Sequence, residues 1–458
     1  MFQVATIALF LFASISYAAD WPPTLDKANT VTKSNDGRII ERYTHGPRVQ
    51  WGYAVSSNAG WDYPAAQESG AAEQNHNSFY VISPKAPQKG APLYVVLHSA
   101  NRTAYDYLGY AALDRKIDEG NDPATAMTNV PEGFYGLYLN STNAEWWGWT
   151  QARQNSAKHI DTPPAAELRV LDTIEWVVQH YGIDRNRIYL SGVSMGGNGA
   201  LGIGINHGDI FAAMRVTVPA GTGFASYSMG GFAPSPDVIA PQAKRDAWIA
   251  KASGTDNPDP PVIVDFSSPI DSWSMTQPAL VQAAVDGRLP LVLSWGPFGH
   301  TTFASAIAKS PLCQIALAFP WLEIRKNEAY PVFTHASSDQ QSPWLHGPAD
   351  FDESGQVNAY FRWKDEADSP REFSMLLWME HPLVKSPPAS MPDHATANVT
   401  LRRLQYFTAV AGKAYLWKLS KNGRLLASGV ITGDATNLLT IPGVPLTMQP
   451  TKLIVTFK

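Results

Sequence analysis

The chain has 458 residues and a nearly balanced charge, with 35 Lys and Arg against 40 Asp and Glu and a formal net charge of −5. That balance offers no electrostatic attraction for nucleic acid or for an anionic membrane surface. Hydrophobic residues make up 45% of the chain and charged residues 16%, which excludes a disordered or coiled-coil protein. Because one hydrophobic core rarely serves so long a chain, two or three domains are expected.

The N-terminus has the pattern of a secretory leader. An uncharged apolar run at residues 5–15 is followed by Ser16, Tyr17 and Ala18, which place small residues at positions −3 and −1 of a signal-peptidase site. The run is too short to span a bilayer, and no later apolar run is long enough to do so. We therefore predict a signal peptide over residues 1–18, a secreted or periplasmic protein, and no membrane partner.

The single cysteine, Cys313, lies in an apolar stretch. One cysteine cannot form an intramolecular disulfide, so stability must come from packing. A lone cysteine among apolar residues, with no histidine nearby, is typical of a core residue and not of a catalytic thiol.

The first part of the chain divides into a lead-in and an α/β region. Residues 19–85 are rich in Asn, Ser, Gly and Pro, and strand-like pieces occur at residues 48–55 and 78–82. From residue 92, apolar strands alternate with helical periods, the pattern of a mostly parallel sheet covered by helices. This predicts an α/β catalytic domain over residues 86–335. Its strands are expected at residues 93–97, 135–139, 188–190, 214–218, 262–266 and 291–295.

Two features between these strands stand out. A helix is expected to begin after Thr162, with prolines in its first turn, and to end at Gly182. Residues 220–260 carry many Gly, Pro, Ser and Asp, which indicates a long insertion beside an active site.

After about residue 335, short β-rich runs separated by turn residues replace the helical periodicity. Asn422-Gly423 is a hairpin signal within this region. We predict a separate antiparallel β-sandwich domain over residues 340–458 that carries no catalytic residue. The runs lie at residues 358–363, 373–378, 414–419, 425–430 and 453–457.

A Gly-x-Ser-x-Gly pentapeptide, residues 192–196, carries the candidate nucleophile Ser194. It follows an expected strand and opens a segment that can form a helix. That context is the one in which a strained turn, flanked by small residues, lifts a serine hydroxyl above a sheet. A glycine-rich turn with an ordinary surface serine is the alternative interpretation.

A serine nucleophile needs a base, and His300 follows the last expected core strand after a Gly-Pro-Phe-Gly loop. The third member should come from the loop after the preceding strand. Asp271 lies in that loop, whereas Asp265 lies within the strand itself, so we favour Asp271. The order Ser194, Asp271, His300 is the α/β-hydrolase order.

These residues resemble a known family. The expected strand running into His98-Ser99-Ala100, the approach at residues 184–190 and the glycine-rich turn at residues 192–197 are similar to secreted α/β-hydrolase esterases. That group includes feruloyl and acetylxylan esterases and polyhydroxyalkanoate depolymerases. The resemblance covers roughly residues 78–310. It implies an α/β-hydrolase fold and hydrolysis of carboxylic esters.

The oxyanion hole requires two backbone N–H groups aimed at the developing negative charge. Met195, directly after the nucleophile, is expected to supply one. The family usually has His-Gly after the first long core strand, but here Ser99 replaces the glycine. The second donor is therefore either Ser99 or Ala100.

Tryptophans are concentrated near these motifs. Trp146, Trp147 and Trp149 follow one core strand, whereas Trp273 and Trp295 lie close in sequence to Asp271 and His300. Such side chains can line a cleft and stack on a sugar or phenolic ring, or they can pack the loops against the body. Both interpretations remain open.

The sequence therefore favours a secreted serine esterase that removes acetyl or feruloyl groups from a plant-type polysaccharide. Two alternatives remain: the same triad acting on a polyester or a peptide, and a non-catalytic carbohydrate-binding protein on a hydrolase fold. The sequence shows no metal-binding cluster and no phosphate-binding glycine motif. No metal, cofactor or nucleic acid is therefore expected.

Overall fold

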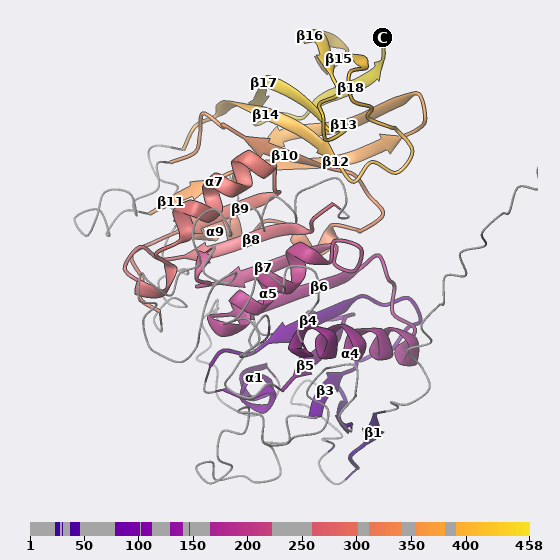
Figure 1. Ribbon diagram of the computed structural model, residues 1–458, viewed down its shortest axis with the longest axis vertical. Helices are drawn as coiled ribbons and strands as arrows, with labels where there is room; N and C mark the ends of the chain where they lie inside the picture. Colours follow the sequence, from indigo (N-terminus) through magenta and orange to yellow (C-terminus); the bar gives the residue numbers. More distant parts are fainter. Residues whose placement is uncertain are drawn as a thin grey trace, which may run out of the picture.

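The computed structural model describes residues 23–27, 30, 37–45, 78–100, 102–111, 129–140, 146, 165–221, 259–300, 311–340, 354–380 and 391–458. Figure 1 shows a large sheet with helices along its faces and the last strands of the chain gathered at one end of the long axis. Within the described residues, no helix is long and apolar enough to cross a membrane. The expected leader, the strand expected at residues 48–55 and the start of the helix after Thr162 lie outside the described residues.

The large sheet has ten strands in the order β1-β2-β3-β5-β4-β6-β7-β8-β9-β11. The six strands from β5 to β9 in this order run parallel, whereas β1, β2 and β3 form an antiparallel edge and β11 pairs antiparallel with β9. Their bounds are β1 Thr24–Leu25, β2 Ile40–Thr44, β3 Ser78–Ile82, β4 Leu93–Leu97, β5 Tyr135–Leu139, β6 Ile188–Val193, β7 Ala213–Thr217, β8 Val262–Ser267, β9 Leu291–Trp295 and β11 Gly355–Val357. All six predicted core strands are thus present, and every residue of them is buried.

Helices cover both faces of this sheet. Helices α4, α5 and α7 pack into one hydrophobic cluster, whereas α1 and α9 pack into the cluster on the other face. The predicted end of α4 at Gly182 is confirmed, because that residue has φ +68° directly after the helix. Cys313 is buried in α9, as expected of a core residue. The bounds are α1 Ala104–Ala111, α4 Ala165–Tyr181, α5 Met195–Asn206, α7 Gln277–Gly287 and α9 Pro311–Leu317, with short 3₁₀ turns η4 Ser272–Ser274 and η5 Trp321–Glu323.

The C-terminal strands form two antiparallel sheets, one ordered β10-β14-β17 and the other β12-β13-β18-β15-β16. The predicted Asn422-Gly423 hairpin is confirmed: both residues have positive φ, 50° and 78°, and join β15 to β16. The bounds are β10 Tyr330–Thr334, β12 Phe361–Asp368, β13 Glu372–Met379, β14 His394–Arg402, β15 Ala414–Lys421, β16 Arg424–Thr432, β17 Leu439–Thr447 and β18 Thr451–Phe457.

Strand pairing crosses the expected boundary at residues 335–340 in both directions. Strand β10 precedes that boundary but pairs with β14 of the C-terminal sheets. Strand β11 follows it but pairs with β9 of the large sheet. One hydrophobic cluster contains both Val264 of β8 and Met375 of β13. The C-terminal sheets therefore share a core with the α/β part of the chain.

Candidate active site

Ser194 occupies a strained turn between β6 and α5. Its φ of 56° and ψ of −118° lie where a residue with a side chain rarely occurs. The turn is held by hydrogen bonds from Ser194 N–H to the carbonyl of Thr217, 2.9 Å, and from Asn198 N–H to the Ser194 carbonyl, 2.9 Å. Such a turn lifts the serine side chain clear of the strand.

The two glycines of the pentapeptide allow this turn to approach its neighbours. A Cβ added to Gly192 would lie 2.0 Å from the carbonyl oxygen of Gly196. A Cβ added to Gly196 would lie 2.0 Å from the carbonyl oxygen of Leu97, at the end of the neighbouring strand. Both obstacles are backbone atoms that cannot rotate away, so the small residues at these positions are a steric requirement.

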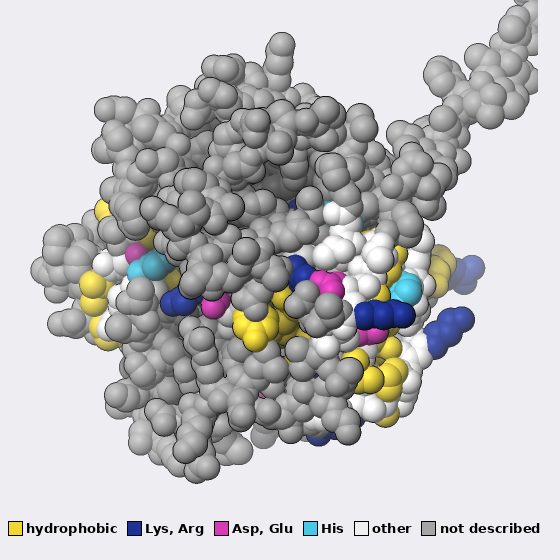
Figure 2. Space-filling model, turned by 90° about the horizontal axis from the view of Figure 1, so that it is seen from below, with side chains coloured by type: hydrophobic (Ala, Val, Ile, Leu, Met, Phe, Trp, Pro, Cys, Tyr) yellow, Lys and Arg dark blue, Asp and Glu magenta, His cyan; other side chains and the backbone are white. Residues whose placement is uncertain are grey.

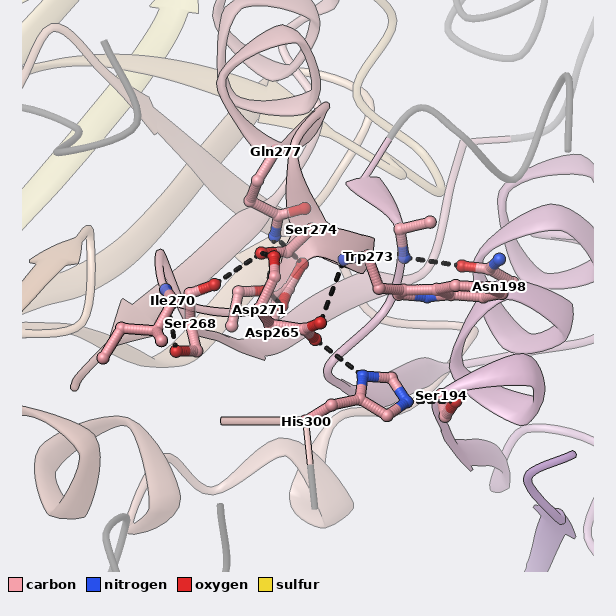
Figure 3. Close-up of polar contacts among 12 residues, drawn as sticks. Ser194, Asn198, Asp265, Ser268, Ile270, Asp271, Trp273, Ser274, Gln277 and His300 are labelled. Carbon is pink, nitrogen blue, oxygen red and sulfur yellow. Dashed lines mark hydrogen bonds and ion pairs between the residues drawn. The ribbon is translucent and has the colours of Figure 1, made fainter. Parts of the chain in front are cut away.

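Ser194, His300 and Asp271 form a continuous hydrogen-bonded relay (Figure 3). Ser194 Oγ lies 2.6 Å from His300 Nε2, and His300 Nδ1 lies 2.7 Å from Asp271 Oδ2. Asp271 is buried, whereas the His300 side chain is 35% exposed. The histidine can therefore meet a substrate while its carboxylate partner is shielded from water.

The loop between β8 and α7 fixes the direction of the Asp271 carboxylate. Its Oδ1 accepts a hydrogen bond from Trp273 N–H at 2.9 Å, which leaves Oδ2 for His300. The Ser274 hydroxyl donates to the carbonyl of Asp271 at 2.8 Å and also contacts the carbonyl of Ser268. Ser274 was not predicted from the sequence, because a serine in a loop carries no distinctive signal.

Asp265, the other aspartate considered for the relay, is directed elsewhere. It lies within β8, is fully buried, and accepts hydrogen bonds from Ser267 and Gln277. Burial raises the pKa of Asp265 to about 7, although these two hydrogen bonds act in the opposite direction. The structure thus brings Asp271, and not Asp265, to His300.

The three backbone N–H groups considered for an oxyanion hole differ in whether an acceptor already engages them. Met195 N–H belongs to the first turn of α5, where no acceptor within the helix exists. Ser99 N–H already donates to the Tyr107 hydroxyl at 3.0 Å. Ala100 N–H, in contrast, has no acceptor within the described part of the chain. Tyr107 was not anticipated from the sequence, since only the fold brings α1 against the loop after β4.

The tryptophans expected to contact substrate have different locations. Trp146 and Trp295 are each 1% exposed, so both pack in the core and the prediction that they line a cleft is wrong for them. Trp273 is only partly buried, and its ring lies edge-on to the His300 imidazole with centroids 5.9 Å apart. Trp147 and Trp149 lie outside the described residues.

Among the described residues, no three His, Cys, Asp or Glu side chains are grouped so as to hold a metal ion.

The chain has distant structural likenesses. No protein-family model and no curated protein matches its sequence. FphF of Staphylococcus aureus, a fluorophosphonate-binding serine hydrolase, is 15% identical with a TM-score of 0.37, covering 54% of this chain and 91% of that one. A ferulic acid esterase is 16% identical with a TM-score of 0.34, covering 54% and 91%. Acetyl xylan esterase from Aspergillus awamori is 18% identical with a TM-score of 0.36, covering 50% and 89%.

Proposed function

We propose that this protein is a serine hydrolase that cleaves carboxylic esters through an acyl-enzyme intermediate. The observation that carries the proposal is the relay from Ser194 through His300 to Asp271, with contacts of 2.6 and 2.7 Å. A serine hydroxyl is a weak nucleophile until a base removes its proton, and here an imidazole nitrogen is within hydrogen-bonding distance of it. A surface serine with no chemical task needs neither the strained backbone nor the buried carboxylate.

The first half of the reaction forms the acyl-enzyme. Ser194 Oγ attacks the ester carbonyl carbon as its proton passes to His300 Nε2, and Asp271 stabilises the imidazolium that forms. The tetrahedral intermediate then collapses: the C–O bond to the alcohol breaks, and His300 gives its proton to the leaving oxygen. In the second half, water attacks the acyl carbon while His300 takes the water proton. The bond from Ser194 Oγ to the acyl carbon then breaks, His300 returns the proton to Ser194 Oγ, and the acid departs.

The negative oxygen of each tetrahedral intermediate needs two donors. We propose Met195 N–H as the first, because it follows the nucleophile at the start of α5. For the second we propose Ala100 N–H, because Ser99 N–H is engaged by Tyr107.

For the substrate, we propose acetyl or feruloyl esters on a plant-type polysaccharide, acted on outside the cell or in the periplasm. The support is the sequence resemblance around residues 78–310, the expected leader, and the partly exposed Trp273 beside His300. An exposed indole face can stack on a sugar or phenolic ring. The C-terminal sheets are proposed to brace the hydrolase or to bind polymer.

Two experiments test the proposed function. A fluorophosphonate should label the purified protein at Ser194, and Ser194→Ala should remove the label. Hydrolysis of an aryl acetate, methyl ferulate, acetylated xylan, an aliphatic polyester and a short peptide should then be compared. Hydrolysis of methyl ferulate or acetylated xylan is the expected result. Activity confined to the polyester or the peptide would support the alternative substrates, and a folded protein that resists the label would favour a non-catalytic carbohydrate-binding protein.

A further inference from the structure

We propose that Asp265, Ser267 and Gln277 form a buried lock that positions Asp271 for proton transfer, and that Asp265 and Gln277 are positioning residues of the active site. This inference rests on the proposed function, because it concerns the acid of the same relay. None of the three side chains touches His300 in the part of the chain that the structure describes. Their effect must therefore pass through the loop that carries Asp271.

The lock is a closed set of hydrogen bonds among three fully buried side chains. Asp265 Oδ1 accepts from the Ser267 hydroxyl at 2.7 Å, and Asp265 Oδ2 accepts from Gln277 Nε2. Gln277 Nε2 also donates to Ser267 Oγ at 2.8 Å. Because alternate residues of a strand point to the same side, Asp265 and Ser267 of β8 both face Gln277.

Two residues of the lock flank the loop that carries Asp271. Ser267 is the last residue of β8, and Gln277 is the first residue of α7. The segment between them, residues 268–276, carries Asp271 near its middle. The hydrogen bond from Gln277 to Ser267 closes this loop at its base. In Figure 3, Gln277 and His300 lie on opposite sides of Asp271.

Two further contacts transmit the closure to Asp271 itself. Ser274, three residues before Gln277, donates to the carbonyl of Asp271 at 2.8 Å. Trp273 N–H holds the carboxylate at 2.9 Å. If α7 began at a different distance from β8, both donors would move with it. The Asp271 Oδ2 to His300 Nδ1 contact would then lengthen.

Burying the Asp265 carboxylate carries a desolvation cost that an apolar side chain at this position would avoid. Asp265 pairs with Val216 on one side and Leu293 on the other, and both of these neighbours are fully buried and apolar. Burial opposes the charged form and raises the pKa of Asp265 to about 7, and both of its hydrogen-bond donors are neutral. An apolar residue would serve packing better here, whereas a carboxylate can accept from a hydroxyl and an amide at once and fix both.

The test exchanges the partners of the lock. In Gln277→Glu, assayed at a pH above the raised pKa of Asp265, the amide donor is replaced by a second carboxylate that can only accept, so the loop base should open. In Asp265→Asn with Gln277→Glu, an amide again donates to a carboxylate, with the roles reversed and the wild-type charge restored. Gln277→Glu should lower kcat for aryl acetate hydrolysis about 10- to 100-fold with little change in KM, as expected of a displaced catalytic group. The double variant should recover to within about threefold of wild type.

Two controls separate positioning from a general loss of stability. Gln282→Glu makes the same substitution on an exposed turn of α7 and should leave kcat unchanged. Proton NMR of the His300 Nδ1–H resonance gives a readout that needs no substrate: the low-field signal of a short contact to Asp271 should weaken or shift in Gln277→Glu and return in the double variant. If Gln277→Glu fails to fold, Ser267→Ala, which removes one donor to Asp265, should show a smaller effect in the same direction.

The outcomes distinguish the two proposals. A folded Gln277→Glu with wild-type kcat and an unchanged His300 resonance would overturn the lock while Ser194 labelling still stood. A double variant no better than Gln277→Glu would also overturn it. If the wild-type protein resisted fluorophosphonate, the proposed function would fail first, whatever the resonance showed.

Discussion

The indole N–H of Trp146 donates a hydrogen bond to the carbonyl oxygen of His98 at 2.8 Å. The Trp146 side chain also packs on α5, where a Cβ added to Gly199 would lie 2.2 Å from Trp146 Cβ. Trp146 therefore ties the loop after β4 to the helix that follows Ser194. These two segments carry the candidate oxyanion donors Ala100 and Met195, so the residue expected to bind substrate instead braces the site from within.

Trp146→Phe should test this role. Phenylalanine keeps an aromatic ring but cannot donate to His98, so the loop carrying Ala100 should become less well fixed. We expect kcat on an aryl acetate to fall about tenfold with KM little changed, since the lost interaction acts mainly on the transition state. Trp363→Phe, a similar change among Phe319 and Phe333 far along the chain, provides the control for general destabilisation. A rise in KM with kcat unchanged would instead show that Trp146 contacts the substrate.

Asp271 and Asp265 should respond differently to amide substitution. Asp271→Asn can place an amide N–H against His300 Nδ1 and should reduce kcat by up to about four decades. Asp265→Asn should cost far less, because Gln277 can turn its side-chain amide and accept from the new N–H group. Steady-state kinetics on an aryl acetate, with folding checked by circular dichroism, measure the comparison. The assignment of Asp271 is wrong if Asp265→Asn is the more damaging change in folded protein.

The turn that carries Ser194 was predictable from sequence because its backbone geometry admits few residues. The turn needs glycines where Gly192 and Gly196 meet backbone atoms, and the chain order then limits where a base and an acid can follow. The choice of Asp271 over Asp265 also followed from local reasoning, since a loop residue can turn its side chain whereas a strand residue is held by its neighbours.

Other features depended on contacts distant in sequence. Strand β17 was not predicted, because Pro442, Gly443 and Pro445 argue against a strand. It lies at the edge of its sheet, where missing N–H donors are tolerated. Strand β10 pairs with β14, and β11 pairs with β9, across the expected boundary. No local sequence pattern encodes such pairing between distant strands. The burial of Trp146 and Trp295 also could not be read locally, because tryptophan suits a core and a cleft equally well.

An ion pair between Arg288 and Asp434 should stabilise the docking of the C-terminal sheets. Arg288 follows α7, and its guanidinium also donates to Thr436 Oγ1 at 3.0 Å. Arg288→Ala should lower the free energy of unfolding by about 1 kcal/mol, a value that allows for the partial exposure of Asp434. The control Arg185→Ala breaks an exposed pair with Glu175 and should cost less than about 0.5 kcal/mol. Chemical denaturation of both variants measures the difference.

The Arg288 effect should depend on pH. Burial pushes the pKa of Asp434 upward, but the hydrogen bond from Arg288 and those from Leu438 and Thr436 outweigh it and lower the pKa from 3.8 to about 2. The folded state therefore binds this proton less readily than the unfolded state. The stabilisation is fully present above about pH 4 and is lost as the pH falls toward 2. The difference in Tm between wild type and Arg288→Ala should accordingly shrink on acidification, and a difference that grew below pH 4 would contradict this account.

Truncation before the C-terminal sheets should prevent folding. A chain ending at residue 338 would lose β11, whose Gly355 pairs with Trp295 at the end of β9, and β14, the partner of β10. It would also lose Arg403, a buried side chain that donates to the carbonyl of Ala212 at 3.2 Å just before β7. The apolar side chains left without partners include Phe333, which packs against Phe361 with ring centroids 4.6 Å apart.

We therefore expect the truncated chain to be insoluble or to lack a cooperative thermal transition, and hence to show no aryl acetate hydrolysis. Removing a shared core exposes far more apolar area than the marginal stability of a domain can absorb. Soluble yield, the thermal transition and activity should be measured beside the full chain. A soluble, cooperatively folding fragment with the activity of the full chain would instead show that residues 86–335 fold independently and that the strands exchanged across residues 335–340 are dispensable.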